Sequence, residues 1–199
     1  MSRPRCSRCL RAQSHCLCGL IPSLPSRTRV LILQHPSEVD HALNTARLAA
    51  LGLQNAQLEV GEVFEALGEW LQQPGYTPRL LFPGEGAQVV AAYPAEVEVL
   101  PWLLVVPDGT WRKARKLLHL NPLLASLPRV TLAPGAVSRY RLRKAPAPGA
   151  LCTLEAIAQA LECLEAPESF APLLAPFERM IEGQIAAMGE ATFARNHQR

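Results

Sequence analysis

Residues 103–111 read LLVVPDGTW, which has the form of a buried strand that ends abruptly and turns into a helix. The aliphatic, β-branched start is typical of a central strand. The proline and glycine beside the aspartate then break the ladder and allow unusual backbone angles. Asp108 is therefore predicted at the carboxyl end of a core strand, where open α/β sheets bind their ligands. The plainer alternative is that Asp108 or Thr110 only caps the following helix.

The rest of the chain repeats this order of strand and helix. Short apolar runs bounded by turn residues predict further strands at 29–34, 79–82 and 129–132. Apolar residues at helical spacing predict helices at about 37–51, 62–72, 111–121, 153–164 and 170–188, with Ser37 and Thr153 as N-caps. The predicted fold class is α/β, with an open, mostly parallel sheet and helices on both faces.

The chain of 199 residues is long enough for one α/β domain and a small attachment. A Pro- and Ser-containing stretch divides an N-terminal unit, residues 1–25, from a main domain, residues 26–188, and residues 189–199 are expected to form a flexible tail. No apolar run is long enough, and free enough of proline and charge, to span a membrane. The first residues lack the apolar core of a secretory signal, so we expect a cytoplasmic protein.

Four of the six cysteines form the pattern Cys6-x2-Cys9-x6-Cys16-x-Cys18. In a cytoplasmic chain, two close cysteine pairs predict a metal site, because two thiolate turns can converge tetrahedrally on one Zn²⁺. Four thiolates leave no open coordination position, so the zinc would be structural. Unrelated thiols, a redox pair or an iron–sulfur cluster are the alternatives. Gly19 is expected to supply the positive φ that such a knuckle often needs.

Most of the 20 basic residues fall into three clusters, within residues 3–29, 112–116 and 139–144. This asymmetry predicts a polyanionic partner, because Arg binds phosphate through paired hydrogen bonds and Tyr140 can stack on a base. Solvated helix and strand faces are the alternative for each cluster. The last cluster runs into a Pro/Gly loop and then a helix start at Thr153, which can receive an anionic or polar ligand.

Taken together, the motifs resemble the DTW-domain family, and the resemblance spans nearly the whole chain. It rests on the four cysteines, Gln34-His35-Pro36 with Asn44-Thr45-Ala46-Arg47, Asp108-Gly109-Thr110-Trp111, and Tyr140-Arg141 with Pro148-Gly149 and Leu151-Cys152-Thr153-Leu154-Glu155-Ala156. Cys152 stands where members of the family commonly have Ser, a change that removes no charged group. The resemblance implies a fold related to the SPOUT methyltransferases, with a C-terminal trefoil knot that holds the cofactor. Periodicity alone cannot predict a knot.

The same resemblance implies a tRNA-uridine aminocarboxypropyltransferase. Such an enzyme transfers the 3-amino-3-carboxypropyl group of S-adenosylmethionine to N3 of a uridine in tRNA and releases methylthioadenosine. The alternatives are an S-adenosylmethionine-dependent RNA methyltransferase on the same fold, an enzyme that acts on rRNA, and a non-catalytic zinc-knuckle RNA-binding protein. The oligomeric state stays open between monomer and homodimer.

Carried over residue by residue, the resemblance places the cofactor against three loops. The expected cofactor-binding residues are Phe82, Pro83, Gly84, Pro107, Asp108, Gly109, Leu151, Cys152, Thr153 and Leu154. The expected catalytic residues are Asp108, Thr110 and Trp111. Asp108 would take or orient the N3 proton of the uridine, or hold the amino group of the cofactor's methionine part. The expected tRNA-binding residues are Arg112, Arg115, Tyr140, Arg141, Arg143 and Lys144, and Arg141 or Arg143 could bind the transferred carboxylate.

Overall fold

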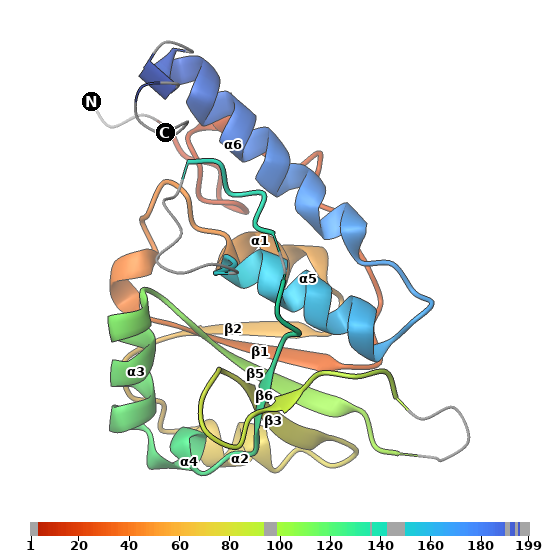
Figure 1. Cartoon of the computed structure of the whole chain (residues 1–199). Coiled ribbons are helices and arrows are strands. Elements are labelled where there is room, and N and C mark those ends of the chain that lie inside the picture. The colour runs from red at the N-terminus through yellow and green to blue at the C-terminus, as the bar shows by residue number, and fades with distance from the viewer. Residues whose placement is uncertain are drawn as a thin grey trace.

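The fold is built on one open sheet of six parallel strands (Figure 1). The computed structural model describes residues 4–93, 99–135, 137–142, 150–189, 192, 193 and 195. The strands are β1 (Arg29–Gln34), β2 (Ala56–Val60), β3 (Thr77–Leu81), β4 (Gln88–Val89), β5 (Trp102–Asp108) and β6 (Arg129–Thr131). Their order is β2-β1-β5-β3-β6-β4, and every neighbouring pair is parallel. The prediction of an open parallel sheet is confirmed.

Helices cover both faces of the sheet, as predicted. On one side lie α1 (Ala46–Gly52), α5 (Thr153–Leu164) and α6 (Leu174–Met188), and on the other lie α2 (Leu67–Leu71), α3 (Trp111–Leu120) and α4 (Pro122–Ala125) (Figure 1). Alternate residues of β5 supply the two cores. Leu104 and Val106 join the core with α1, α5 and α6, while Leu103 and Val105 join the core with α2, α3 and α4.

Several elements differ from their predicted bounds. The helix expected from Ser37 begins only at Ala46, because the 3-10 helix η2 (Pro36–Glu38) and a series of turns come first. The side chain of Asn44 binds the carbonyls of the preceding turns and the N–H of Arg47, which fixes the helix start there. The strands β2 and β4 were not predicted, and the helix expected at 62–72 shortens to α2.

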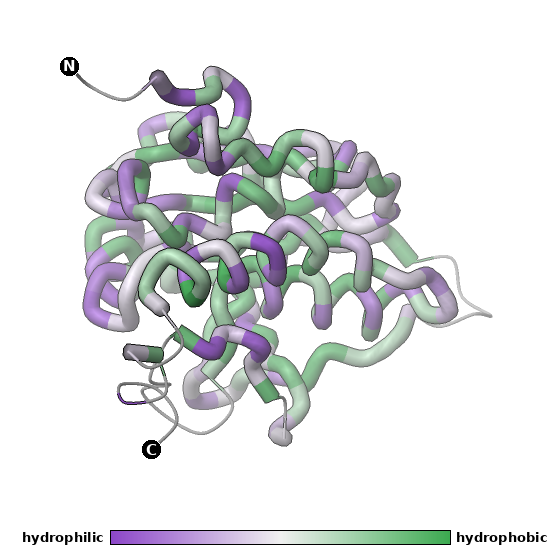
Figure 2. The backbone as a smooth tube through the Cα atoms, turned by 90° about the horizontal axis from the view of Figure 1, so that it is seen from above, coloured by the Kyte–Doolittle hydropathy of each residue, from purple (hydrophilic) through white to green (hydrophobic). Residues whose placement is uncertain are grey.

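The C-terminal helix also begins later than predicted, because the 3-10 helix η3 (Ala171–Leu173) precedes it. The tube in Figure 2 alternates between hydrophilic and hydrophobic positions along its helical coils, as expected for helices with one buried face. Beyond α6, the side chain of Phe193 is buried. Within the part of the chain that the structure describes, no helix has the length and apolar run needed to cross a membrane.

The N-terminal unit packs on the layer of α1 and α6. Its described residues form the 3-10 helix η1 (Gln13–His15), turns, an antiparallel bridge between Arg5 and Ala12, and a parallel bridge from Leu24 to Leu53. Leu17 is buried in the core that α1 and α6 share. The guanidinium of Arg11 donates to the carbonyl of Ala42 over 2.8 Å and also contacts the sulfur of Met180. The knuckle is thereby fastened beside the turns that precede α1.

Candidate functional site at the carboxyl edge of the sheet

The register of β1 and β5 sets Gln34 directly beside Asp108 at the carboxyl edge of the sheet. The side-chain amide of Gln34 donates from Nε2 to Asp108 Oδ2 over 2.7 Å. Both residues are buried, with Gln34 2% and Asp108 8% exposed. Asp108 is thus a carboxylate at the end of a central strand, as the sequence predicted, and its hydrogen bonds point to side chains instead of to the helix that follows.

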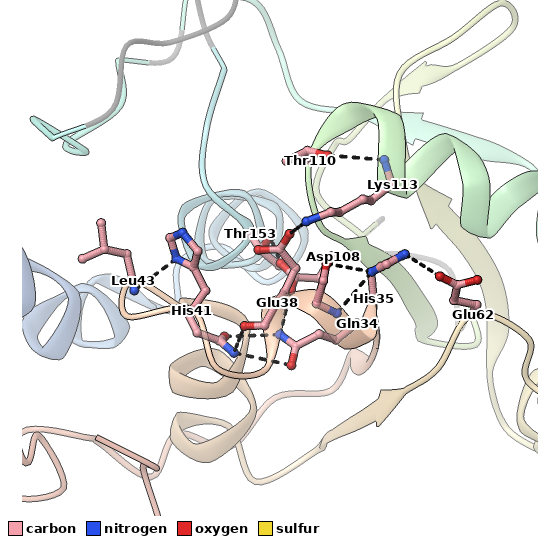
Figure 3. A network of polar contacts seen from close by, with 12 residues as sticks. Gln34, His35, Glu38, His41, Leu43, Glu62, Asp108, Thr110, Lys113 and Thr153 are labelled. Atoms are coloured by element: carbon pink, nitrogen blue, oxygen red, sulfur yellow. Dashed lines mark hydrogen bonds and ion pairs between the residues drawn. The ribbon is translucent and has the colours of Figure 1, made fainter. Parts of the chain in front are cut away.

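Thr153 approaches the same carboxylate from the start of α5. Its hydroxyl donates from Oγ1 to Asp108 Oδ1 over 2.5 Å, so each carboxylate oxygen accepts one hydrogen bond (Figure 3). The prediction that Thr153 is the N-cap of α5 is wrong, because Cys152 holds that position. Glu155 closes the helix start by accepting the N–H of Cys152 over 2.9 Å. The hydroxyl of Thr153 is therefore available to Asp108.

Burial raises the pKa of Asp108, since a buried carboxylate loses the solvation of its charge. The hydrogen bonds from Thr153 and Gln34 act in the opposite direction and lower the pKa. The charge of Glu38 raises it further, and the charge of His41 lowers it. A carboxyl group with a raised pKa at a strand end is the profile expected of a group that binds or moves protons.

The turn after Asp108 requires glycine. Gly109 has φ +151°, a conformation that L side chains rarely adopt, and a Cβ there would lie 3.0 Å from the Cβ of Lys113. Thr110 then accepts the N–H of Lys113 through Oγ1 over 3.4 Å and caps α3. The capping interpretation is therefore right for Thr110 but does not account for Asp108.

Phe82 and Trp111 bring the turn after β3 against the start of α3. Their rings lie 5.5 Å apart at an interplanar angle of 63°. Phe82 is buried, whereas Trp111 is 37% exposed, so this tryptophan lies at the surface and not in the core. Pro83 and Gly84 are exposed in the turn that follows. Because β3 is the parallel neighbour of β5, this turn and the Asp108 turn leave the same edge of the sheet.

Two residues of the third predicted loop, Cys152 and Leu154, are buried in the core, and burial raises the pKa of the Cys152 thiol. The structure thus brings Asp108 and Gly109 together with the start of α5 through Thr153, and it brings the Phe82 turn against Trp111. Three segments far apart in sequence converge at one edge.

A second group of charges borders the first. The Nε2 of His35 lies 2.8 Å from Glu62 Oε1, and Lys116 Nζ lies 2.6 Å from the other oxygen of Glu62. The hydrogen bond from Lys116 lowers the pKa of Glu62. Lys113 pairs with Glu38 over 2.7 Å (Figure 3). The other ring nitrogen of His35, Nδ1, lies 3.0 Å from the hydroxyl of Ser37, so both ring nitrogens have partners.

Sequence reasoning gave no role to Gln34, Glu38, Asn44 or Glu62. The pattern of residues offers one signal for Gln34, since it ends a predicted parallel strand just as Asp108 does. Which strand lies beside which could not be read from the sequence, so the pairing of the two ends was not predictable.

The predicted tRNA-binding residues fall into two groups. Arg112 and Arg115 lie exposed along α3. Tyr140 is half-buried, and its ring meets that of Phe177 edge to face at 5.4 Å. Arg141 is exposed. Arg143 and Lys144 lie outside the described residues.

Glu155 fastens this basic segment to α5. Its carboxylate accepts the hydroxyl of Ser138 over 2.8 Å and the N–H of Arg139 over 2.6 Å, besides the N–H of Cys152. Glu155 is 6% exposed, and three donors compensate its burial. The segment that leads to Tyr140 is therefore held at the start of the helix that carries Thr153.

The four N-terminal cysteines form a compact cluster. Their sulfur atoms all lie within 4.8 Å of one another, with Cys6 and Cys18 at 3.6 Å and Cys9 and Cys16 at 3.8 Å. A tetrahedral ion with Zn–S bonds of ~2.3 Å needs sulfur atoms about 3.8 Å apart. The cluster therefore has the donor atoms and the spacing to hold one metal ion.

Backbone geometry supports the same arrangement at the first cysteine pair. The N–H groups of Cys9 and Arg8 lower the pKa of Cys6 to about 6. The positive φ that was expected at Gly19 falls instead at Leu10, whose φ is +59° and whose N–H donates to the carbonyl of Cys6 over 2.9 Å. The fourth cysteine also lies in a turn, closed by the hydrogen bond from Leu20 N–H to the carbonyl of Leu17 over 2.9 Å.

Comparison with known proteins gives a consistent result. The family model of the DTW domain matches residues 3–185. A protein of Macaca fascicularis named tRNA-uridine aminocarboxypropyltransferase 2 is 30% identical over 98% of this chain and 68% of its own length. The proteins of the same name in Mus musculus and Drosophila melanogaster are each 32% identical, over 82% and 92% of this chain. The chain spans 57% of the mouse protein and 76% of the fly protein. No solved structure was found to match.

Proposed function

This chain belongs to the DTW-domain family, and we propose that it is a tRNA-modifying transferase that moves the 3-amino-3-carboxypropyl group of S-adenosylmethionine to N3 of a tRNA uridine. The relatives named tRNA-uridine aminocarboxypropyltransferase support the class of reaction. The observation that carries the site is the buried Asp108, which accepts one hydrogen bond on each oxygen where three loops converge.

The donor would lie against the loops of Phe82-Pro83-Gly84, Pro107-Asp108-Gly109 and Leu151-Cys152-Thr153-Leu154. Gly109 serves the turn itself, because a Cβ at this position would crowd Lys113 and His35. One feature of the site fits a bound nucleoside. The exposed ring of Trp111, supported edge-on by Phe82, offers a flat apolar wall.

The chemistry follows from the charge on sulfur in S-adenosylmethionine, which activates three carbons. A site that presents Cγ of the methionine part, and keeps the methyl group away from the nucleophile, selects the larger group through alignment. Uridine N3 loses its proton and bonds to Cγ, while the Cγ–S electron pair passes to sulfur and leaves methylthioadenosine. Asp108 would accept the N3 proton, orient the N3–H, or hold the ammonium of the transferred group.

The tRNA would be bound by six residues, namely Arg112, Arg115, Tyr140, Arg141, Arg143 and Lys144. Exposed arginines on α3 suit phosphate contacts, which displace counterions and make binding dependent on salt.

We further propose that Cys6, Cys9, Cys16 and Cys18 hold one structural Zn²⁺. Their sulfur atoms lie too close together to surround a multi-iron cluster, which favours a single ion.

The SPOUT-like fold with its trefoil knot belongs to the same proposal. It is supported by the parallel sheet with helices on both faces.

The proposal is tested with purified protein, unmodified tRNA and S-adenosylmethionine. Nucleoside analysis by mass spectrometry should find a uridine heavier by one aminocarboxypropyl group, and methylthioadenosine should appear in equal amount. A uridine heavier by one methyl group, with S-adenosylhomocysteine as by-product, would instead assign a methyltransferase. Binding of tRNA without either product would make the chain a non-catalytic RNA-binding protein. Ribosomal RNA serves as the parallel substrate that separates tRNA from rRNA specificity.

A further inference from the structure

The buried side-chain amide of Gln34 forms hydrogen bonds with two residues, Asp108 and Asn44. Its Nε2 donates to Asp108 Oδ2 over 2.7 Å (Figure 3). The same Nε2 donates to Asn44 Oδ1 over 3.2 Å, and Oε1 accepts from Asn44 Nδ2 over 3.4 Å. An apolar side chain of the same size would fill this space without needing partners, whereas an amide that is 2% exposed must have its polar atoms satisfied. The contacts of Gln34 therefore point to a task beyond filling the core.

The main chain fixes which way this amide faces. Asn44 Oδ1 accepts the N–H of Arg47 over 3.2 Å, and Asn44 Nδ2 donates to the carbonyl of Glu38 over 3.0 Å. A backbone N–H can only donate and a carbonyl can only accept, so the Asn44 amide has one orientation. If Gln34 were reversed, its oxygen would face the oxygens of Asn44 and Asp108. Asn44 thus directs the NH₂ group of Gln34 toward Asp108.

We propose that Gln34 is a positioning residue that, aligned by Asn44, keeps Asp108 in the carboxylate form during the reaction. This inference rests on the proposed function and narrows it. A carboxylate that receives N–H and O–H donors acts toward its substrate as an acceptor, so Asp108 would meet a donor such as the uridine N3–H or an ammonium group. A role as proton donor to the substrate would not fit these contacts.

The other charges near Asp108 bear on the same titration. Glu38 and His41, in the turns after β1, respectively oppose and favour the ionised form. Lys113 of α3 is paired with Glu38 over 2.7 Å, which offsets the charge of that glutamate. From α5 the neutral hydroxyl of Thr153 faces Asp108. The side chain of His35 turns away to Glu62. Gln34 is then the neutral donor that β1 contributes.

The test measures the pKa of Asp108 by ¹³C NMR of protein labelled at the aspartate carboxyl carbon. The chain has two aspartates, Asp40 and Asp108, so the spectrum is simple to assign. Gln34→Met removes the amide and keeps the volume. The expected result is a rise of about one unit or more in the Asp108 pKa, because a hydrogen bond to a charged group contributes on this scale. Gln57→Met, on the adjacent strand β2, is the matched control and should leave the pKa unchanged.

Activity gives the second readout. On the acid side of the pH–rate profile, the pH of half-maximal rate should be higher in Gln34→Met than in the wild type, by the same amount as the Asp108 pKa measured by NMR. The variant should lose less of the wild-type rate at high pH than at neutral pH. An unchanged Asp108 pKa in Gln34→Met would overturn the inference. The NMR titration needs no turnover, so it stays decisive even if the wild-type protein fails to produce modified tRNA, which is the result that would refute the proposed function.

If Gln34→Met does not fold, the inference is tested by NMR titration of the wild-type protein. The side-chain NH₂ resonances of Gln34 should shift along the same titration curve as the carboxyl carbon of Asp108, because one of those protons is bound to it. Resonances of Gln34 that are insensitive to the ionisation of Asp108 would contradict the proposal.

Discussion

Cys6 and Cys18 are 12 positions apart, whereas Asp108 meets Gln34 from 74 positions away and Thr153 from 45 positions away. The cysteine cluster is defined by local spacing and by four identical ligand atoms. The carboxylate site is defined by the register of two parallel strands and by the packing of a distant helix. A local pattern of one residue type can be read from the sequence, but a site assembled by sheet order cannot.

In this comparison of the cysteine cluster with the carboxylate site, the largest effect is expected from Asp108→Asn. Loss of the carboxylate should lower the rate of modification by about 100-fold or more, the usual effect of removing a general base or an orienting group. tRNA binding should be retained. Asp40→Asn is the matched control, because Asp40 is the other aspartate and its side chain is 79% exposed. A rate near that of the wild type in Asp108→Asn would reduce Asp108 to a structural residue.

The same variant, Asp108→Asn, tests how the stability of the protein depends on pH. Burial raises the folded-state pKa of Asp108 above its unfolded value, so the folded protein binds this proton more readily. This group therefore increases the free energy of unfolding as the pH falls through the raised pKa, and it lowers stability above that pKa. Calorimetry should find the melting temperature of Asp108→Asn at or above the wild-type value at neutral pH. A melting temperature clearly below the wild-type value would contradict this direction of the pKa shift.

The activity of the wild-type protein should fall with decreasing pH as Asp108 becomes protonated.

Removal of a ligand tests the other region. If the proposed site holds zinc, Cys9→Ser should reduce it from one ion per chain to none, because Cys9 would supply one of the four ligands and is buried. The melting temperature should fall, since metal binding is coupled to folding of the knuckle. Cys163→Ser, at a half-buried cysteine in α5, should keep the zinc. Plasma emission spectrometry measures the metal. Finding no metal in the wild-type protein, with four free thiols, would refute the site.

Gly109→Ala probes the turn that carries Asp108. The residue has φ +151°, and the added Cβ would sit 3.0 Å from the Cβ of Lys113. Strain of this kind costs about 1–3 kcal/mol of stability, measured by chemical denaturation. Gly183→Ala in α6 is the control, because a Cβ there meets no atom within 4 Å and alanine favours a helix. Equal stability of the two variants would show that the turn tolerates a side chain.

The smallest effect is expected on the basic face of α3. The double variant Arg112→Gln and Arg115→Gln should weaken tRNA binding several-fold and lower the slope of log affinity against log salt by about one to two. Arg179→Gln, exposed on α6, is the control and should leave both values unchanged. Binding is measured by fluorescence anisotropy at several salt concentrations. An unchanged slope would place the tRNA elsewhere.

The sequence predicted those parts of the fold that depend on neighbours in the chain. The strand at Arg29–Gln34, the centre of β5 and the cysteine cluster follow from runs and spacings of a few residues. The turns before α1 were mistaken for helix, because their form depends on Asn44 and on contacts from Arg11. Thr153 was mistaken for a cap, because its true partner lies on another strand.

The hydrogen bond from Thr153 to Asp108 has a consequence for how the protein is made. A nascent chain leaves the ribosome amino end first, and contacts of long sequence separation form only after both partners have emerged. The cysteine cluster is complete once residue 18 is free. The carboxylate of Asp108 gains its second donor only when Thr153 has been synthesised. A chain that ends before this point would carry its metal ligands but hold Asp108 by one hydrogen bond, so unfinished copies should be unable to modify RNA.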